Sequence, residues 1–291
     1  MTAAIANNEK MSTLLTGLCA QQRLIREREL IKLKTLMNDQ ELTGPLLTHI
    51  LAELTNTSNW EQAAGLIAAA SALLPVCETA QVEALYEHAL VLLDHDESRV
   101  RKQAGELMAK ALGCLAEPAK TKSAYEQLVG LITRDLKRDP GADQLPENEK
   151  VRQKIIEGQA KRGMTSEQIF HESAGWRHLE TSMSALKRLF EVNNESGLLT
   201  QSLFDLIDEC ARHSNRFIRE NSFYILSAVM DETLNHNPEL IDAFAKLIYK
   251  VFESLNISQK TQYLFNQGSL RQLESSSHGK LKLLPLIPIR P

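Results

Sequence analysis

The chain has 291 residues, of which 43% are hydrophobic and 24% are charged, as in ordinary folded proteins. A net charge of −4 and a pI near 6.1 give no overall attraction to nucleic acid or to acidic membranes, so neither is expected as a partner. No stretch approaches 18 apolar residues, so no membrane span is expected. Aromatic residues make up only 5%, and a core of leucine and alanine favours helices over sheets.

Amphipathic segments with helical spacing come in pairs along the chain. The first segments cover residues 11–19, 43–54, 80–93 and 198–211, and the second segments begin beside a polar turn at Ile25, Trp60, Val100, Trp176 and Ile218. These starts are 35, 40, 76 and 42 residues apart, and a period near 40 is typical of two-helix repeats. The interval of 76 corresponds to two periods, or to one period with an insertion.

The second segments share one apolar pattern at positions i, i+4, i+7, i+8 and i+11, which lie on one face of an α-helix. It is clearest in Val100, Ala104, Leu107, Met108 and Ala111, and it recurs from Ile218 and from Trp60 with a serine in one position. A two-helix unit cannot bury such a stripe alone, but stacking on its neighbours completes the core. The pattern therefore predicts an all-α solenoid of five to seven stacked antiparallel helix pairs.

The turns before these segments resemble those of HEAT repeats, in which an Asp or Asn precedes a hydrophobic residue followed by Arg. The matching residues are Asp96 with Val100 and Arg101, Asn215 with Ile218 and Arg219, and Ile25 with Arg26, while Trp176 and Arg177 lack the preceding Asp and Trp60 lacks the Arg. The resemblance covers about residues 10–255. It implies a HEAT- or armadillo-like superhelix in which Asp96, Arg101 and Arg219, together with Arg26 and Arg177, form a ladder that fixes the stacking.

The same pattern divides the chain into five parts. We expect a flexible N-terminus at 1–9, repeats at 10–138, a charged insertion or loop at 139–168, further repeats at 169–256 and an irregular tail at 257–291. The insertion opens with the turn residues Asp139, Pro140 and Gly141. The last helix, expected up to Leu255, has no convincing second helix after it, which suggests an array that is truncated or alternatively spliced.

Two tryptophans, Trp60 and Trp176, follow turns between helices. Each is either a buried staple of its helix pair or an exposed anchor for a partner. Trp176, Arg177 and His178 resemble locally the turn with which the HEAT arrays called TOG domains contact tubulin. That resemblance makes tubulin a possible partner, on the condition that Trp176 is exposed.

No motif for catalysis, phosphate binding or metal binding is found, so we expect neither an enzyme nor a cofactor or metal site. Four scattered cysteines without a CxxC pair favour free thiols in a reducing compartment, the cytoplasm or the nucleus. The predicted function is a non-catalytic scaffold or adaptor that binds other proteins along its concave surface. The alternative is a microtubule-binding module.

Overall fold

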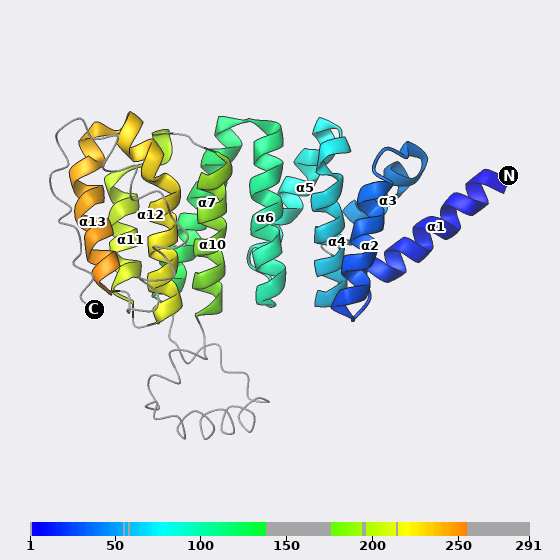
Figure 1. The fold of residues 1–291 in the computed structure, drawn as a ribbon, viewed down its shortest axis with the longest axis horizontal. Helices are drawn as coiled ribbons and strands as arrows, with labels where there is room; N and C mark the ends of the chain where they lie inside the picture. Colours follow the sequence, from blue (N-terminus) through cyan, green and yellow to red (C-terminus); the bar gives the residue numbers. More distant parts are fainter. Residues whose placement is uncertain are drawn as a thin grey trace, which may run out of the picture.

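The computed structural model describes residues 2–54, 56–57, 59–137, 176–193, 196–213 and 215–254. Within these ranges the chain forms α-helices and short 3-10 helices and no strand. The helices stand side by side in an elongated row that begins with α1 and ends with α13 (Figure 1). The predicted all-α class is therefore confirmed.

The row has two layers. The first layer contains α1 (Thr2–Leu18), α3 (Gln40–Glu53), α5 (Thr79–Leu92), α7 (Pro118–Leu136), α11 (Gln201–Ala211) and α13 (Ile241–Ser254). The second layer contains α2 (Arg23–Thr35), α4 (Trp60–Leu73), α6 (Ser98–Leu115), α10 (Arg177–Val192) and α12 (Arg216–His236). The 3-10 helices η1 (Leu74–Val76), η3 (Ser196–Leu198) and η4 (Pro238–Leu240) lie in connections between them.

Each second-layer helix packs on its first-layer partner and on its second-layer neighbours. The pairs are α1 with α2, α3 with α4, α5 with α6, α7 with α10 and α11 with α12, and α2, α4, α6, α10 and α12 pack in that order. This is the expected α-solenoid with HEAT-like stacking, here with five pairs plus α13 in the described part of the chain. Since α6 packs directly on α10, the interval of 76 residues is one period with an insertion.

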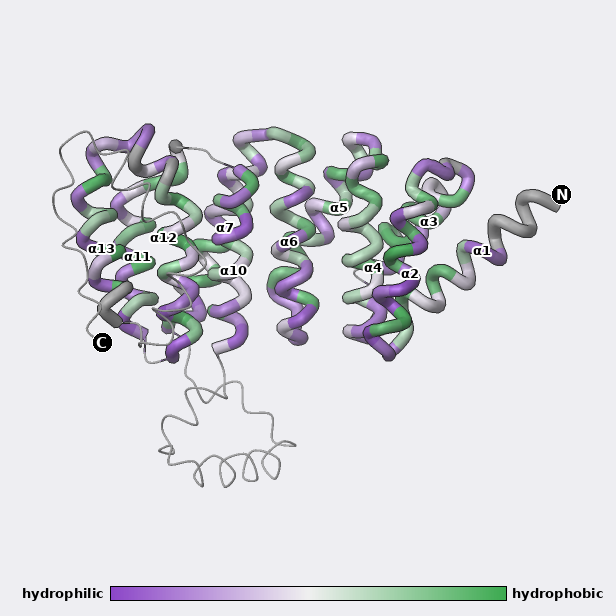
Figure 2. Tube along the Cα trace, in the orientation of Figure 1, coloured by the Kyte–Doolittle hydropathy of each residue, from purple (hydrophilic) through white to green (hydrophobic). Residues whose placement is uncertain are grey.

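The apolar pattern explains why the second-layer helices form and stack. All five positions from Val100 to Ala111 are fully buried, as are Ile218, Ile225, Leu226 and Val229. Figure 2 shows hydrophobic and hydrophilic stretches alternating along the helices, as amphipathic helices require. Ser222 is buried in the same row and donates its hydroxyl to the Ile218 carbonyl oxygen at 3.1 Å, so the helix itself satisfies this polar side chain. Buried residues from Leu14 to Val251 form one continuous core.

Side-chain caps fix where several helices begin. The Asn59 Oδ1 accepts from the backbone N–H groups of Glu61 and Gln62 at the start of α4, and the Asn215 side chain does the same for Phe217 in α12. The C-cap of α6, Ala116, has a φ of 52°, the left-handed conformation that ends a helix, and α7 begins two residues later at Pro118. These local signals set the short turns on which the site residues lie.

Three sequence expectations concern the ends and the insertion. Helix α1 begins at Thr2, so residues expected in a flexible N-terminus at 1–9 belong to a helix. The insertion at 139–168 and the tail at 257–291 lie outside the described residues. In the described helices no segment is long and apolar enough to cross a bilayer.

Candidate functional site

Arg101 clamps the turn between α5 and α6 and also reaches the next helix pair. Its Nη1 donates to the carbonyl oxygens of His95 at 2.5 Å and Asp96 at 2.8 Å, and its Nε donates to Thr181 Oγ1 in α10 at 2.9 Å. The side chain is only 2% exposed. One buried guanidinium therefore closes its own turn and joins two successive units.

Arg26 and Arg219 clamp their own turns in the same way. Arg26 Nη1 donates to the carbonyl oxygens of Ala20 at 2.6 Å and Gln21 at 2.8 Å, and Arg219 Nη1 donates to that of His213 at 2.9 Å. Both side chains are half-buried, so these clamps are more exposed to water than that of Arg101.

The ladder implied by the HEAT resemblance takes a different form here. Asp96 offers its backbone oxygen to Arg101, while its carboxylate lines the hollow described below, and the link to the next unit is Thr181. Arg177 is the first residue of α10 and is exposed, whereas Arg101 and Arg219 lie in the fourth position of their helices. Arg177 therefore does not occupy the clamp position, because α10 begins in a different register.

Two histidines belong to the clamped turns, and the sequence interpretation did not single them out for this role. His95 Nδ1 accepts from the backbone N–H of Glu97, and His213 Nδ1 accepts from that of Asn215, both at 2.9 Å. In both turns the histidine stands two residues before the N-cap and six before the arginine. This repeated spacing was the available signal.

Both tryptophans join neighbouring units. Trp176 is 8% exposed, and its ring packs edge-on against His213 with 4.0 Å between ring centroids. Trp60 is half-buried, with the Arg99 guanidinium 4.6 Å and that of Arg26 6.0 Å from its ring centroid. Trp176 is thus a staple between units, and its interpretation as an exposed anchor is wrong because the ring is covered. Trp60 is only partly buried.

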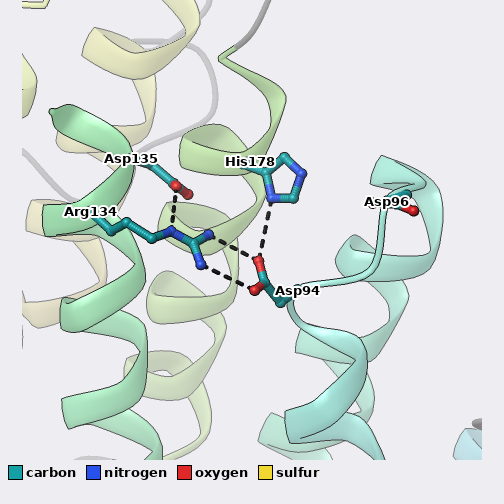
Figure 3. A pocket seen from close by; sticks show the side chains of 5 residues that line it. All are labelled: Asp94, Asp96, Arg134, Asp135 and His178. Carbon is teal, nitrogen blue, oxygen red and sulfur yellow. Dashed lines mark hydrogen bonds and ion pairs between the residues drawn. The ribbon is translucent and has the colours of Figure 1, made fainter. Parts of the chain in front are cut away.

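A polar hollow of about 480 Å³ opens where the α5–α6 turn, the end of α7 and the start of α10 meet (Figure 3). Arg134 Nη1 and Nη2 donate to the two carboxylate oxygens of Asp94 at 3.1 and 2.9 Å, and its Nε donates to Asp135 Oδ1 at 2.9 Å. His178 Nδ1 lies 3.7 Å from Asp94 Oδ1. Asp96 completes the lining. Asp94 and Arg134 are 40 residues apart in the sequence, so no local sequence pattern could pair them.

Asp94 and Arg134 stabilise each other in the ionised form. Hydrogen bonds from Arg134 lower the pKa of the Asp94 carboxyl, and Asp94, followed by Asp135, raises the pKa of Arg134. Asp135 is 2% exposed, and its Oδ2 has no hydrogen-bond donor within the described residues. A buried carboxylate oxygen without a hydrogen-bond donor is energetically costly.

Helices α6, α10 and α12 of the second layer leave a group of side chains partly or fully exposed, here called the second-layer surface: Lys102, Lys110, Glu180, Lys187 and Tyr224. Lys187 Nζ lies 5.7 Å from the Tyr224 ring centroid, which joins α10 to α12. Burial raises the pKa of the Glu180 carboxyl, and Lys102 opposes that rise, which places Glu180 near α6. Tyr224 is 37% exposed, so this surface offers an aromatic ring among charges.

Other kinds of site find little support in the described residues. No group of three or more His, Cys, Asp or Glu side chains there is arranged to hold a metal ion. The four cysteines are free, and burial raises the pKa of the Cys210 thiol to about 12, which makes it a poor nucleophile.

Comparisons with known proteins add no family. Neither protein-family models nor curated proteins match the chain. Among solved structures the chain is similar to a designed armadillo repeat protein, with 14% identity over 86% of this chain and 94% of that one and a TM-score of 0.41. It is also similar to an engineered protein, with 10% identity over 84% and 97% of the two chains and a TM-score of 0.39. Because both TM-scores are below 0.5, the fold assignment depends on the helix packing described above.

Proposed function

We propose that the protein is a non-catalytic scaffold that binds another protein on its second-layer surface. The observation that carries the proposal is the unequal packing of the two layers. In the second layer α6 and α10 approach so closely that a Cβ on Gly105 would lie 2.6 Å from the Cβ of Ala185. In the first layer α5 and α7 are bridged by long side chains, such as Arg134 to Asp94.

A row of helix pairs curves toward the layer whose helices are closer together. The second layer is then the inner side of the array, where successive helices present side chains to one extended partner. Tyr224, near Lys187 and Glu220, supplies an aromatic side chain of the kind that is enriched in interface hot spots. Lys102 and Lys110 add positive charge to the same surface. In the hollow, Arg134 is bonded to Asp94 and Asp135, so its guanidinium is already occupied by the protein itself.

Site-specific photo-crosslinking of the full chain tests this function. The photoreactive residue benzoylphenylalanine replaces Lys110 or Tyr224 on the second layer. In the matched controls it replaces Val91 or Lys122, which are exposed on the first layer. In an extract of the cells that make the protein, we expect the second-layer positions to give defined adducts with another protein, and the first-layer positions to give few. Adducts confined to the first-layer positions would overturn the proposal.

Tubulin is not proposed as the partner. The alternative required an exposed Trp176 beside basic residues, and Trp176 is instead covered by His213. Arg177 is exposed at this turn, but a lone basic residue does not single out tubulin. For the compartment, the four free thiols support a reducing one, such as the cytoplasm or the nucleus.

A further inference from the structure

Two of the four cysteines, Cys77 and Cys114, belong to successive helix pairs and lie at the same end of the second layer. Cys77 directly follows the 3-10 helix η1 at the end of α4, and Cys114 lies in the last turn of α6. The chain reverses twice between α4 and α6, so these neighbouring helices are parallel and their C-terminal ends lie side by side (Figure 1). In agreement, η1 packs directly on α6.

A contact at the other end of the two helices fixes their register. The Arg99 guanidinium, in the first turn of α6, lies 4.6 Å from the ring centroid of Trp60, the first residue of α4. From this level α4 and η1 continue to Val76 and α6 continues to Leu115, which are spans of nearly equal length. Cys114 follows Arg99 by about four helical turns, so it lies on the same side of α6 as Arg99, the side toward α4. The register therefore brings the thiol of α6 to the end of α4.

The two thiols differ in their access to solvent. Cys114 is exposed, whereas Cys77 is half-buried and its Sγ donates to the Leu73 carbonyl oxygen at 3.3 Å. Burial raises the pKa of the Cys77 thiol to about 11, and the charge of a Cys114 thiolate adds to the rise because the two sulfurs are neighbours. A reagent from solution therefore reaches Cys114 first and finds Cys77 beside it.

We propose that Cys77 and Cys114 form a reversible disulfide within the chain, with a small disulfide such as oxidised glutathione as the oxidant. The Cys114 thiolate attacks one sulfur of oxidised glutathione, which forms a mixed disulfide and releases one glutathione thiolate. The Cys77 thiol then loses its proton, and its sulfur attacks that of Cys114, which forms the Cys77–Cys114 bond and releases the second glutathione thiolate. The cysteines lose two electrons and two protons, and oxidised glutathione gains both. In a reducing compartment such a bond is transient, as in redox sensing.

Oxidation of the purified full chain tests the pair without any partner, so this test and the crosslinking test can fail independently. The dilute chain is equilibrated in mixtures of reduced and oxidised glutathione, free thiols are blocked with N-ethylmaleimide, and the digested peptides are identified by mass spectrometry. We expect Cys77–Cys114 to be the main disulfide within the chain, and to disappear when reduced glutathione is in excess. Disulfides formed mainly by Cys19 or Cys210, or Cys114 that carries glutathione without any bond to Cys77, would overturn the proposal.

Serine variants show whether Cys77 resolves the mixed disulfide. In C77S the share of Cys114 that carries glutathione should rise about tenfold over wild type, because the neighbouring thiol is gone. In C114S, Cys77 should stay largely reduced, and C19S, which removes another half-buried thiol, should leave the disulfide unchanged. The wild-type measurement needs no substitution, so it decides the matter even if a variant fails to fold. Equal glutathione on Cys114 in wild type and C77S would contradict the proposal.

Discussion

The junctions α5–α7 and α6–α10 join the same two helix pairs with different chemistry. In the first layer, polar side chains at intervals of seven along α7 reach across to α5: Lys120 Nζ to Glu83 Oε1 at 2.5 Å, Gln127 Nε2 to the Leu90 carbonyl oxygen at 3.2 Å, and Arg134 to Asp94. In the second layer, α6 and α10 touch through Gly105 and Ala185, with one buried hydrogen bond from Arg101 to Thr181.

The difference shows which contacts hold the array together. Exposed ion pairs such as those on α7 each contribute little, because water and salt screen them. Close apolar packing and a satisfied buried guanidinium are costly to disrupt. We therefore expect the stability of the array to depend on the second-layer junction, and the first-layer junction to adjust the spacing between units.

The largest expected effect is at Arg101. The substitution Arg101→Met keeps apolar volume but removes the donors to His95, Asp96 and Thr181, and should lower the free energy of unfolding by about 3–5 kcal/mol. Arg219→Met removes a half-buried clamp and should cost only about 1 kcal/mol. Urea unfolding of both variants measures the difference. Equal losses of unfolding free energy would contradict the larger contribution assigned to Arg101.

A pair of glycine substitutions compares the layers directly. Gly105→Ala would place its Cβ 2.6 Å from that of Ala185 and should destabilise the protein by about 1–3 kcal/mol. Gly130→Ala, on α7, meets no atom within 4 Å and should stabilise it by about 0.5–1 kcal/mol through helix propensity. Thermal melts of the two variants should shift in opposite directions, and a shift in the same direction would count against the comparison.

Tyr86 provides an intermediate case within the first-layer junction. Its ring is buried, and its hydroxyl donates to the Lys120 carbonyl oxygen at 3.1 Å. Tyr86→Phe keeps the ring and should cost about 0.5–1.5 kcal/mol in urea unfolding. A loss as large as that of Arg101→Met would show that the first layer carries more stability than this account allows.

The smallest effect is expected at Asp94, and it should depend on pH. Arg134 lowers the pKa of Asp94 in the folded protein, so the pair stabilises the fold above the unfolded pKa of about 3.9 and loses that contribution as pH falls through the folded value. Both side chains are about half exposed, so Asp94→Asn should cost only about 0.2–1 kcal/mol at pH 7. The gap between wild type and variant in unfolding free energy should shrink below about pH 4, whereas a constant gap would contradict the ion-pair origin.

The sequence predicted those features that depend on local periodicity. Four of the five expected starts lie within second-layer helices, and the fifth, Trp176, is the N-cap of α10. The positions from Val100 to Ala111 are buried, because helical spacing reports which face meets the core. The turn arginines were also found, although their partners were not. Arg101 binds backbone oxygens and Thr181, 80 residues away, and no local pattern encodes the register between two stacked helices.

The hollow could not be predicted for the same reason. Asp94 and Arg134 are 40 residues apart, and they meet only because α7 pairs with α10 beyond the insertion. The burial of Trp176 likewise depends on His213 in the following unit. By contrast, the spacing shared by His95 with Arg101 and by His213 with Arg219 is visible in the sequence, and it could have identified the clamped turns.

A double-mutant cycle on Arg101 and Thr181 tests most directly whether the second layer is continuous across the insertion. Arg101→Met and Thr181→Val are made singly and together. In a control cycle, Thr181→Val is replaced by Thr233→Val, which removes a buried hydroxyl that donates to the Val229 carbonyl oxygen within α12. The account predicts a coupling free energy of about 1 kcal/mol or more between Arg101 and Thr181, and about zero in the control. Additive effects of Arg101→Met and Thr181→Val would contradict it.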